Sequence, residues 1–151
     1  MTKDIMRFEG GKELEQALRA LPGTTARASA RRVMKGAGEI VARAAQALAP
    51  VLTGELVESY GIGTQLTRRQ RRAARGGDKA DVEVFIGPGE GGYQAGLQTE
   101  FGNEHQAAQP HLRPAFDANV RNVLDHISRE WWADIEKTLA RRARKLARQA
   151  R

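Results

Sequence analysis

The chain has 151 residues, enough for one domain, and a formal net charge of +7 from 25 Lys plus Arg against 18 Asp plus Glu. It contains no cysteine, which excludes a disulfide framework, a thiolate zinc site and a cysteine nucleophile. Alanine supplies 24 of the apolar residues and buries little area, so we expect a thin core that self-association completes. The chain has neither an apolar run near the ~20 residues that span a bilayer nor a signal-peptide pattern, so we expect a cytoplasmic protein without membrane contact. The basic balance favours an acidic partner, either nucleic acid or the acidic face of another protein.

The N-terminal part predicts two helices separated by a turn. Leucines spaced four and then three residues apart predict a helix over about 12–21, and Pro22 ends it. The hydroxyl of Thr24 or Thr25 is expected to cap a second helix, rich in alanine, that runs to about Ala49.

The second helix contains two glycines. Gly36 and Gly38 each weaken a helix by about 1 kcal/mol relative to alanine. The sequence leaves open whether they compensate for this cost by permitting a close helix crossing.

The central part has the two-residue period of strands. Strands are predicted over about 56–64 and 81–87, joined as a hairpin by a long, charged loop. The five arginines of that loop are Arg68, Arg69, Arg71, Arg72 and Arg75. Such a density of guanidinium groups is suited to contact with DNA phosphates. The alternative is a solvated loop that repels its own kind or meets an acidic patch on a partner protein.

The C-terminal part predicts a short helix over 93–101 and a long helix after the proline-bounded stretch 109–117. Beyond residue 140 the chain has six basic residues and no acid. We therefore expect a single domain over 1–140 and a solvated, frayed basic tail over 141–151, unless a partner orders the tail. The fold class is α+β, in which a small antiparallel sheet with a long Arg-rich hairpin loop packs against a long Ala-rich helix and a long C-terminal helix.

Several residues of the last helix are candidates for an interface. Trp131 and Trp132 point about 100° apart, so only Trp131 lies on the apolar stripe. Trp132 is then typical of a protein interface, unless another helix of the chain covers it. Arg113 lies between two prolines and could pair with Glu100, with Asp117 or with a neighbouring subunit. The full set of candidate interface residues is Trp132, Arg113, Arg141, Arg142, Arg144 and Lys145.

Nothing in the sequence indicates an enzyme. The three histidines, His105, His111 and His126, do not form the pair at four-residue spacing that a helical zinc site uses. The glycine-rich stretch 87–92 lacks the lysine that follows in a phosphate-binding loop. We therefore expect no catalytic residues, no cofactor and no metal.

Three short motifs, in their order and spacing, resemble a known family. They are AQALAPVLTGELVESYGIG at 45–63, YQAGLQTEFG at 93–102 and QPHLRPAFD at 109–117. From Phe8 to about Ile127 the chain resembles the bacteriophage head–tail joining family named after gene product ten of phage HK-ninety-seven. The positions that match by motif, which the resemblance implies define the fold, are Pro50, Thr53, Gly54, Leu56, Glu100, Phe101, Gly102, Pro110, Arg113, Pro114 and Phe116.

The resemblance implies a structural virion protein that forms a ring at the head–tail junction of a long-tailed phage or phage-like particle. A sixfold ring is favoured, with a twelvefold ring as the alternative. The implied partners are a head-completion or connector protein on one side and a tail terminator or tail tube protein on the other, with DNA in the channel as a further contact. The protein would be assembled in the host cytoplasm and reside in the neck of the virion. Two alternatives stay open: a free-standing nucleic-acid-binding protein, and a regulator of tail assembly that leaves the finished particle.

Overall fold

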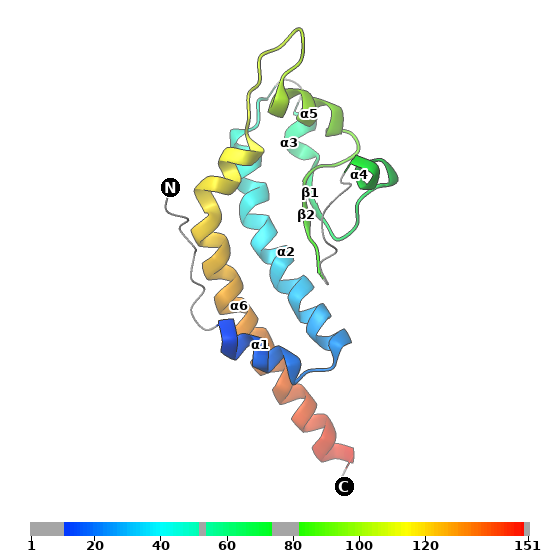
Figure 1. Ribbon diagram of the computed structural model, residues 1–151, viewed down its shortest axis with the longest axis vertical. Helices are drawn as coiled ribbons and strands as arrows, with labels where there is room; N and C mark the ends of the chain where they lie inside the picture. The colour runs from blue at the N-terminus through cyan, green and yellow to red at the C-terminus, as the bar shows by residue number, and fades with distance from the viewer. Residues whose placement is uncertain (1–10, 52–53, 74–81, 150–151) are drawn as a thin grey trace.

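The fold is built around two long antiparallel helices, with a small sheet on the side of α2 that faces away from α6 (Figure 1). This computed structural model describes residues 11–51, 54–73 and 82–149. The helices are α1 (Gly11–Arg19), α2 (Gly23–Leu48), α3 (Glu55–Glu58), α4 (Arg68–Ala73), α5 (Tyr93–Phe101) and α6 (Leu112–Gln149). The strands β1 (Tyr60–Gly63) and β2 (Phe85–Pro88) pair antiparallel, with Tyr60 opposite Pro88 and Gly63 opposite Phe85. The predicted α+β class is confirmed.

Helix α2 lies between two layers, α6 on one side and the sheet on the other (Figure 1). Gly36 faces α6, because a Cβ built on it would lie 2.6 Å from Nε2 of His126. Gly38 faces the sheet, where such a Cβ would lie 3.4 Å from both Ile62 and Ile86. Two residues along a helix turn it by about 200°, so the two glycines serve opposite faces. Gly36 therefore leaves room for the imidazole of His126 on α6, and Gly38 leaves room for the two isoleucines of the sheet.

Two clusters of buried apolar residues hold these layers together. One lies at the end of α2 and includes Ala45, Leu56, Tyr60 and Ala115. The other joins Leu21 to Ile135, with both tryptophans of α6 packed against it. Alanine contributes much of the first cluster, which agrees with the thin core expected from composition.

A polar cluster also ties α2 to α6. Asp134 accepts hydrogen bonds from the buried hydroxyl of Ser29 (2.5 Å) and from Arg32 (2.7 Å). The Arg32 guanidinium is the strongest influence on this carboxyl and lowers its pKa despite partial burial. These hydrogen bonds join Asp134 to two residues that lie more than a hundred positions earlier in the sequence.

Several predicted boundaries are wrong in detail. Helix α2 begins at Gly23 without a side-chain cap, because the carbonyl of Pro22 accepts the N–H groups of Thr25 and Ala26 in place of a threonine hydroxyl. The predicted strand 56–64 begins only at Tyr60, since the preceding residues form α3. The second strand spans Phe85–Pro88, and residues 82–84 of the predicted 81–87 are not strand, because its partner β1 has only four residues to pair with. Residue 81 lies outside the described residues.

The C-terminal segment is helical, contrary to the predicted frayed tail. Helix α6 continues without a break past residue 140 to Gln149, and residues 141–149 are all exposed. Arginine, lysine, alanine, leucine and glutamine are strong helix formers, so the backbone stays helical where no neighbour covers it. Residues 141–149 are exposed as expected, while residues 150–151 of the predicted tail lie outside the described residues. The division at 140/141 stays a prediction.

Candidate functional site

The arginine-rich segment is partly a helix rather than a plain loop. Thr67 and Gln70 cap α4 reciprocally: the Thr67 N–H donates to the Gln70 side chain (2.9 Å) and the Gln70 N–H donates to the Thr67 hydroxyl (3.3 Å). This is a capping box, a signal present in the sequence that the loop prediction missed. The side chains of Arg68, Arg71 and Arg72 are exposed, and no carboxylate of the described residues pairs with them. The side chain of Arg69 and all of Arg75 lie outside the described residues.

Glu100 fastens the end of α5 to the start of α6. Its carboxylate accepts three backbone N–H groups, from His111 (2.8 Å), Leu112 (2.9 Å) and Arg113 (3.1 Å). Leu112 and Arg113 are in the first turn of α6 and His111 directly precedes it, at the end where a helix has unpaired N–H groups and a partial positive charge. Burial opposes ionisation of Glu100, but the three N–H donors and nearby His111 outweigh it and lower the pKa of the carboxyl.

His111 and Tyr60 complete the surroundings of Glu100. His111 is 1% exposed, its Nδ1 lies 3.3 Å from Glu100, and its ring meets Tyr60 edge-on with centroids 5.8 Å apart. Burial and, secondarily, the charge of Glu100 raise the pKa of Tyr60 to about 12. Sequence reasoning singled out Glu100 but treated His111 as a surface or loop histidine. No local pattern shows that this histidine is buried against a tyrosine of another element.

Arg113 does not make the predicted ion pair within the chain. Its backbone N–H, not its guanidinium, contacts Glu100, and its side chain is exposed. Among the described residues, no carboxylate pairs with that side chain. An ion pair between Arg113 and a neighbouring subunit stays a prediction.

The motif positions shared with the resembled family lie mostly at turns and helix ends. Gly54, with φ 86°, starts α3, so this turn precedes a helix and not the strand expected. Gly102, with φ 74°, ends α5 as predicted, and a Cβ there would lie 2.8 Å from the amide nitrogen of Ala108. Pro114 is in the first turn of α6, where proline is tolerated. Thr53 lies outside the described residues.

Among the described residues, large apolar side chains from three helix ends are exposed at one end of the molecule. They are Leu48 (54% exposed), Val51 (76%), Phe101 (72%) and Phe116 (48%), and we call them the apolar end. They come from the end of α2 and the residues just after it, the end of α5 and the start of α6, which lie together in Figure 1. Of these, Phe101 and Phe116 are family-motif positions, whereas no local pattern predicted the exposure of Leu48 and Val51.

The predicted interface residues of α6 are separated along the helix. Trp132 is partly buried against the cluster of Leu21 and Ile135, so another part of the same chain covers it in part. Arg141, Arg144 and Lys145 are exposed. Arg142 donates to the carbonyl of Ala20 at 3.4 Å, just after α1 ends.

The histidines do not gather into one cluster. His105 contacts Glu104 on the surface at 3.2 Å, while His126 lies against Gly36. In the described parts of the chain, no group of three acidic or histidine side chains could hold a metal ion. No helix there is long and apolar enough to cross a membrane.

Comparison with protein families matches residues 12–102 to the family described as "Bacteriophage HK97-gp10, putative tail-component". Comparisons with curated proteins and with solved structures gave no match. The match includes the first two motifs, while the third, QPHLRPAFD, begins beyond its end. Because the match covers more than half of the chain, the protein belongs to this family of phage tail components.

Proposed function

We propose that this protein is a non-enzymatic ring subunit at the head–tail junction of a phage or phage-like particle. Membership of the family supports a structural role in the virion and contacts with other virion proteins. The single observation that carries the finer proposal is the apolar end, defined above by Leu48, Val51, Phe101 and Phe116.

Exposed phenylalanines are costly in a small protein unless a partner covers them. Aromatic residues at the centre of an interface commonly provide much of the binding free energy. Phe101 and Phe116 sit on rigid helix ends that Glu100 holds together, so they are presented in a fixed arrangement. We infer that the apolar end contacts the adjacent subunit.

A closed ring requires a head-to-tail contact in which two different surfaces of the subunit meet. Sixfold closure is favoured and twelvefold closure is the alternative. The ring would lie in the neck, between a head-completion or connector protein and a tail terminator or tail tube protein. In this proposal residues 1–140 form the neck domain and residues 141–151 an accessory basic segment.

The arginines of α4 fit either of two neighbours within this ring. Arg68, Arg71 and Arg72 would face DNA in the channel or dock on an acidic face of the next ring, together with Arg69 and Arg75 of the same segment. Both readings use the exposed, unpaired guanidinium groups described above.

The ring proposal is tested by mass measurement of the native protein and by imaging the neck of intact particles. Phe101→Ser and Phe116→Ser should shift the protein from ring to monomer without unfolding it, because both side chains are exposed. Leu139→Ser is the matched control, since Leu139 is an apolar residue of α6 outside the apolar end and is 41% exposed, close to the 48% of Phe116. A strict monomer in solution and in particles, with no cyclic copy number, would contradict the proposal.

The second candidate function is free-standing nucleic-acid binding, which the exposed side chains of Arg68, Arg71 and Arg72 in α4 favour. It predicts strong binding of duplex DNA at low salt and a weaker salt dependence when Arg68, Arg71 and Arg72 are replaced by glutamine. Failure of the isolated protein to bind duplex DNA rejects this candidate. Absence of the protein from purified particles would instead favour the assembly regulator.

A further inference from the structure

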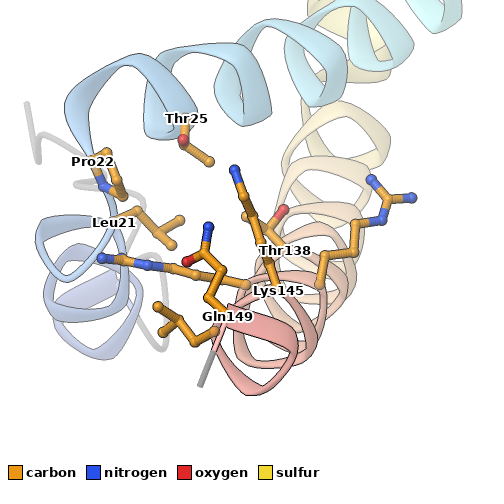
Figure 2. A pocket seen from close by; sticks show the side chains of 9 residues that line it. Leu21, Pro22, Thr25, Thr138, Lys145 and Gln149 are labelled. Carbon is orange, nitrogen blue, oxygen red and sulfur yellow. The ribbon is translucent and has the colours of Figure 1, made fainter. Parts of the chain in front are cut away.

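A cleft lies where α6 extends past the start of α2. Its volume is about 400 Å³, and it is lined by Leu21, Pro22 and Thr25 on one side and by residues of α6 from Thr138 to Gln149 on the other. Figure 2 shows Lys145 and Gln149 reaching across from α6 toward the turn that joins α1 to α2. None of these residues belongs to the apolar end.

The cleft continues the packing surface of α6 beyond its partner helices. Trp131 and Ile135 pack against Leu21 in the core. The same spacing of alternately three and four residues continues through Thr138, Arg142, Lys145 and Gln149, all of which line the cleft. This spacing is the one by which a helix keeps one face toward another helix. The surface thus has the geometry for one more helix, of about three turns, along residues 138–149.

The walls of the cleft combine apolar contact with positive charge. Leu146 lines it and is 58% exposed, beside Leu21 and Pro22. Among the described residues that line it, Arg141, Arg142 and Lys145 are charged and none is acidic. Arg142 is held by the Ala20 carbonyl, so part of this charge has a fixed position. An occupant must therefore carry both an apolar side chain and carboxylates.

We infer that this cleft docks an acidic amphipathic helix of another protein of the particle. Apolar side chains of that helix would cover Leu146, Leu21 and Pro22, and its flanking Asp or Glu residues would pair with Arg141 and Lys145. This inference rests on the structural role in the virion but not on closure of a ring. Its site is separate from the apolar end, so the two proposals can fail independently.

The chemistry of the cleft disfavours two other occupants. Duplex DNA presents charged phosphates and no apolar side chain, so it would leave Leu146 uncovered. The basic segment of a second copy is also unsuitable, because residues 141–149 contain five basic residues and no acid, and like charges repel.

The test measures binding of labelled synthetic helices to the full chain by fluorescence anisotropy. The probe is a peptide of about three heptads with a leucine seam flanked by glutamates. One comparison peptide replaces its glutamates with glutamine, a second replaces its leucines with serine, and a short DNA duplex is the third ligand. The leucine–glutamate peptide should bind at least about fivefold more tightly than either comparison peptide, and more weakly as salt rises.

Variants of the chain locate the binding. Leu146→Gln and Lys145→Gln should each weaken binding of the leucine–glutamate peptide several-fold. Arg121→Gln, on an exposed position of α6 outside the cleft, is the matched control and should leave binding unchanged. Circular dichroism checks that each variant keeps its helix content.

Three results would overturn the inference. The first is no binding of the leucine–glutamate peptide, and the second is equal binding of the glutamine peptide. The third is tighter binding of duplex DNA that falls with Lys145→Gln but not with Leu146→Gln, which would mark the surface as a nucleic-acid contact. Native mass measured on Leu146→Gln separates these outcomes from the ring proposal, because the ring should persist in that variant.

Discussion

Replacing Glu100 with alanine is expected to destabilise the junction between α5 and α6. The carboxylate accepts three backbone N–H groups at 2.8–3.1 Å, and the substitution removes the acceptor for all three. His111 is buried and Arg113 is exposed. In the variant, water can therefore accept a hydrogen bond from the N–H of Arg113 but not from that of His111.

The expected loss follows from these three bonds. Replacing a neutral capping side chain with alanine costs about 0.5–2 kcal/mol. Glu100 is ionised and mostly buried, and a single hydrogen bond to a charged group contributes about 1.5–3 kcal/mol net of water. The three bonds share one carboxylate and are not additive, and water can reach the amide of the exposed Arg113 in the variant. We therefore expect the free energy of unfolding to fall by about 2–3 kcal/mol in Glu100→Ala. Glu100→Gln keeps one carbonyl acceptor and should lose about 1 kcal/mol.

The measurement is urea denaturation followed by circular dichroism, at one fixed protein concentration because self-association would shift the midpoint. Glu104→Ala is the matched control, since Glu104 lies in the adjoining loop and its side chain is 84% exposed. The control should change stability by less than about 0.5 kcal/mol. If Glu100→Ala and Glu104→Ala lose the same amount, the argument that the carboxylate fastens α6 is refuted.

Three further predictions concern pH and the packing of α2 on α6. The pKa of Glu100 is lowered in the fold, so its stabilisation is complete above the unfolded carboxyl pKa of about 4.3 and is lost as pH falls through the folded value. The stability difference between wild type and Glu100→Gln, measured by denaturation across pH, should therefore shrink in acid. Gly36→Ala should lower the melting temperature, because its Cβ would lie 2.6 Å from His126 Nε2, and His126→Ala should restore it in the double variant. Asp134→Ala should lower the free energy of unfolding by about 1–3 kcal/mol, measured by denaturation. Ser29→Ala should destabilise the Asp134→Ala variant less than it destabilises the wild type, since the two groups share a hydrogen bond.

Helices were predictable from the sequence because their signals are local. The predicted 93–101 agrees with α5, and the predicted 12–21 lies within two residues of α1 at both ends. Gly102 ends α5 as expected, with the positive φ that glycine adopts without strain. The α+β class and the family followed from the same short-range patterns, read in their order along the chain.

The errors arose where local signals were incomplete or misread. The capping box of Thr67 and Gln70 was present but was overlooked in a segment dominated by arginine. The first half of the strand expected over 56–64 is not a strand, because Leu56 belongs to α3 and is buried there in the same cluster as Ala45. A tertiary contact thus overrode the strand pattern.

By itself, the sequence determined where most helices form, where charge accumulates and to which family the chain belongs. Only the tertiary structure decided that Glu100 caps α6, that Gly36 meets His126 and that Phe101 and Phe116 are exposed at one end. The physical reason is that propensity, capping and periodicity act over a few neighbouring residues. Contacts between residues many positions apart depend on which faces of the helices pack together, and no local pattern records that choice.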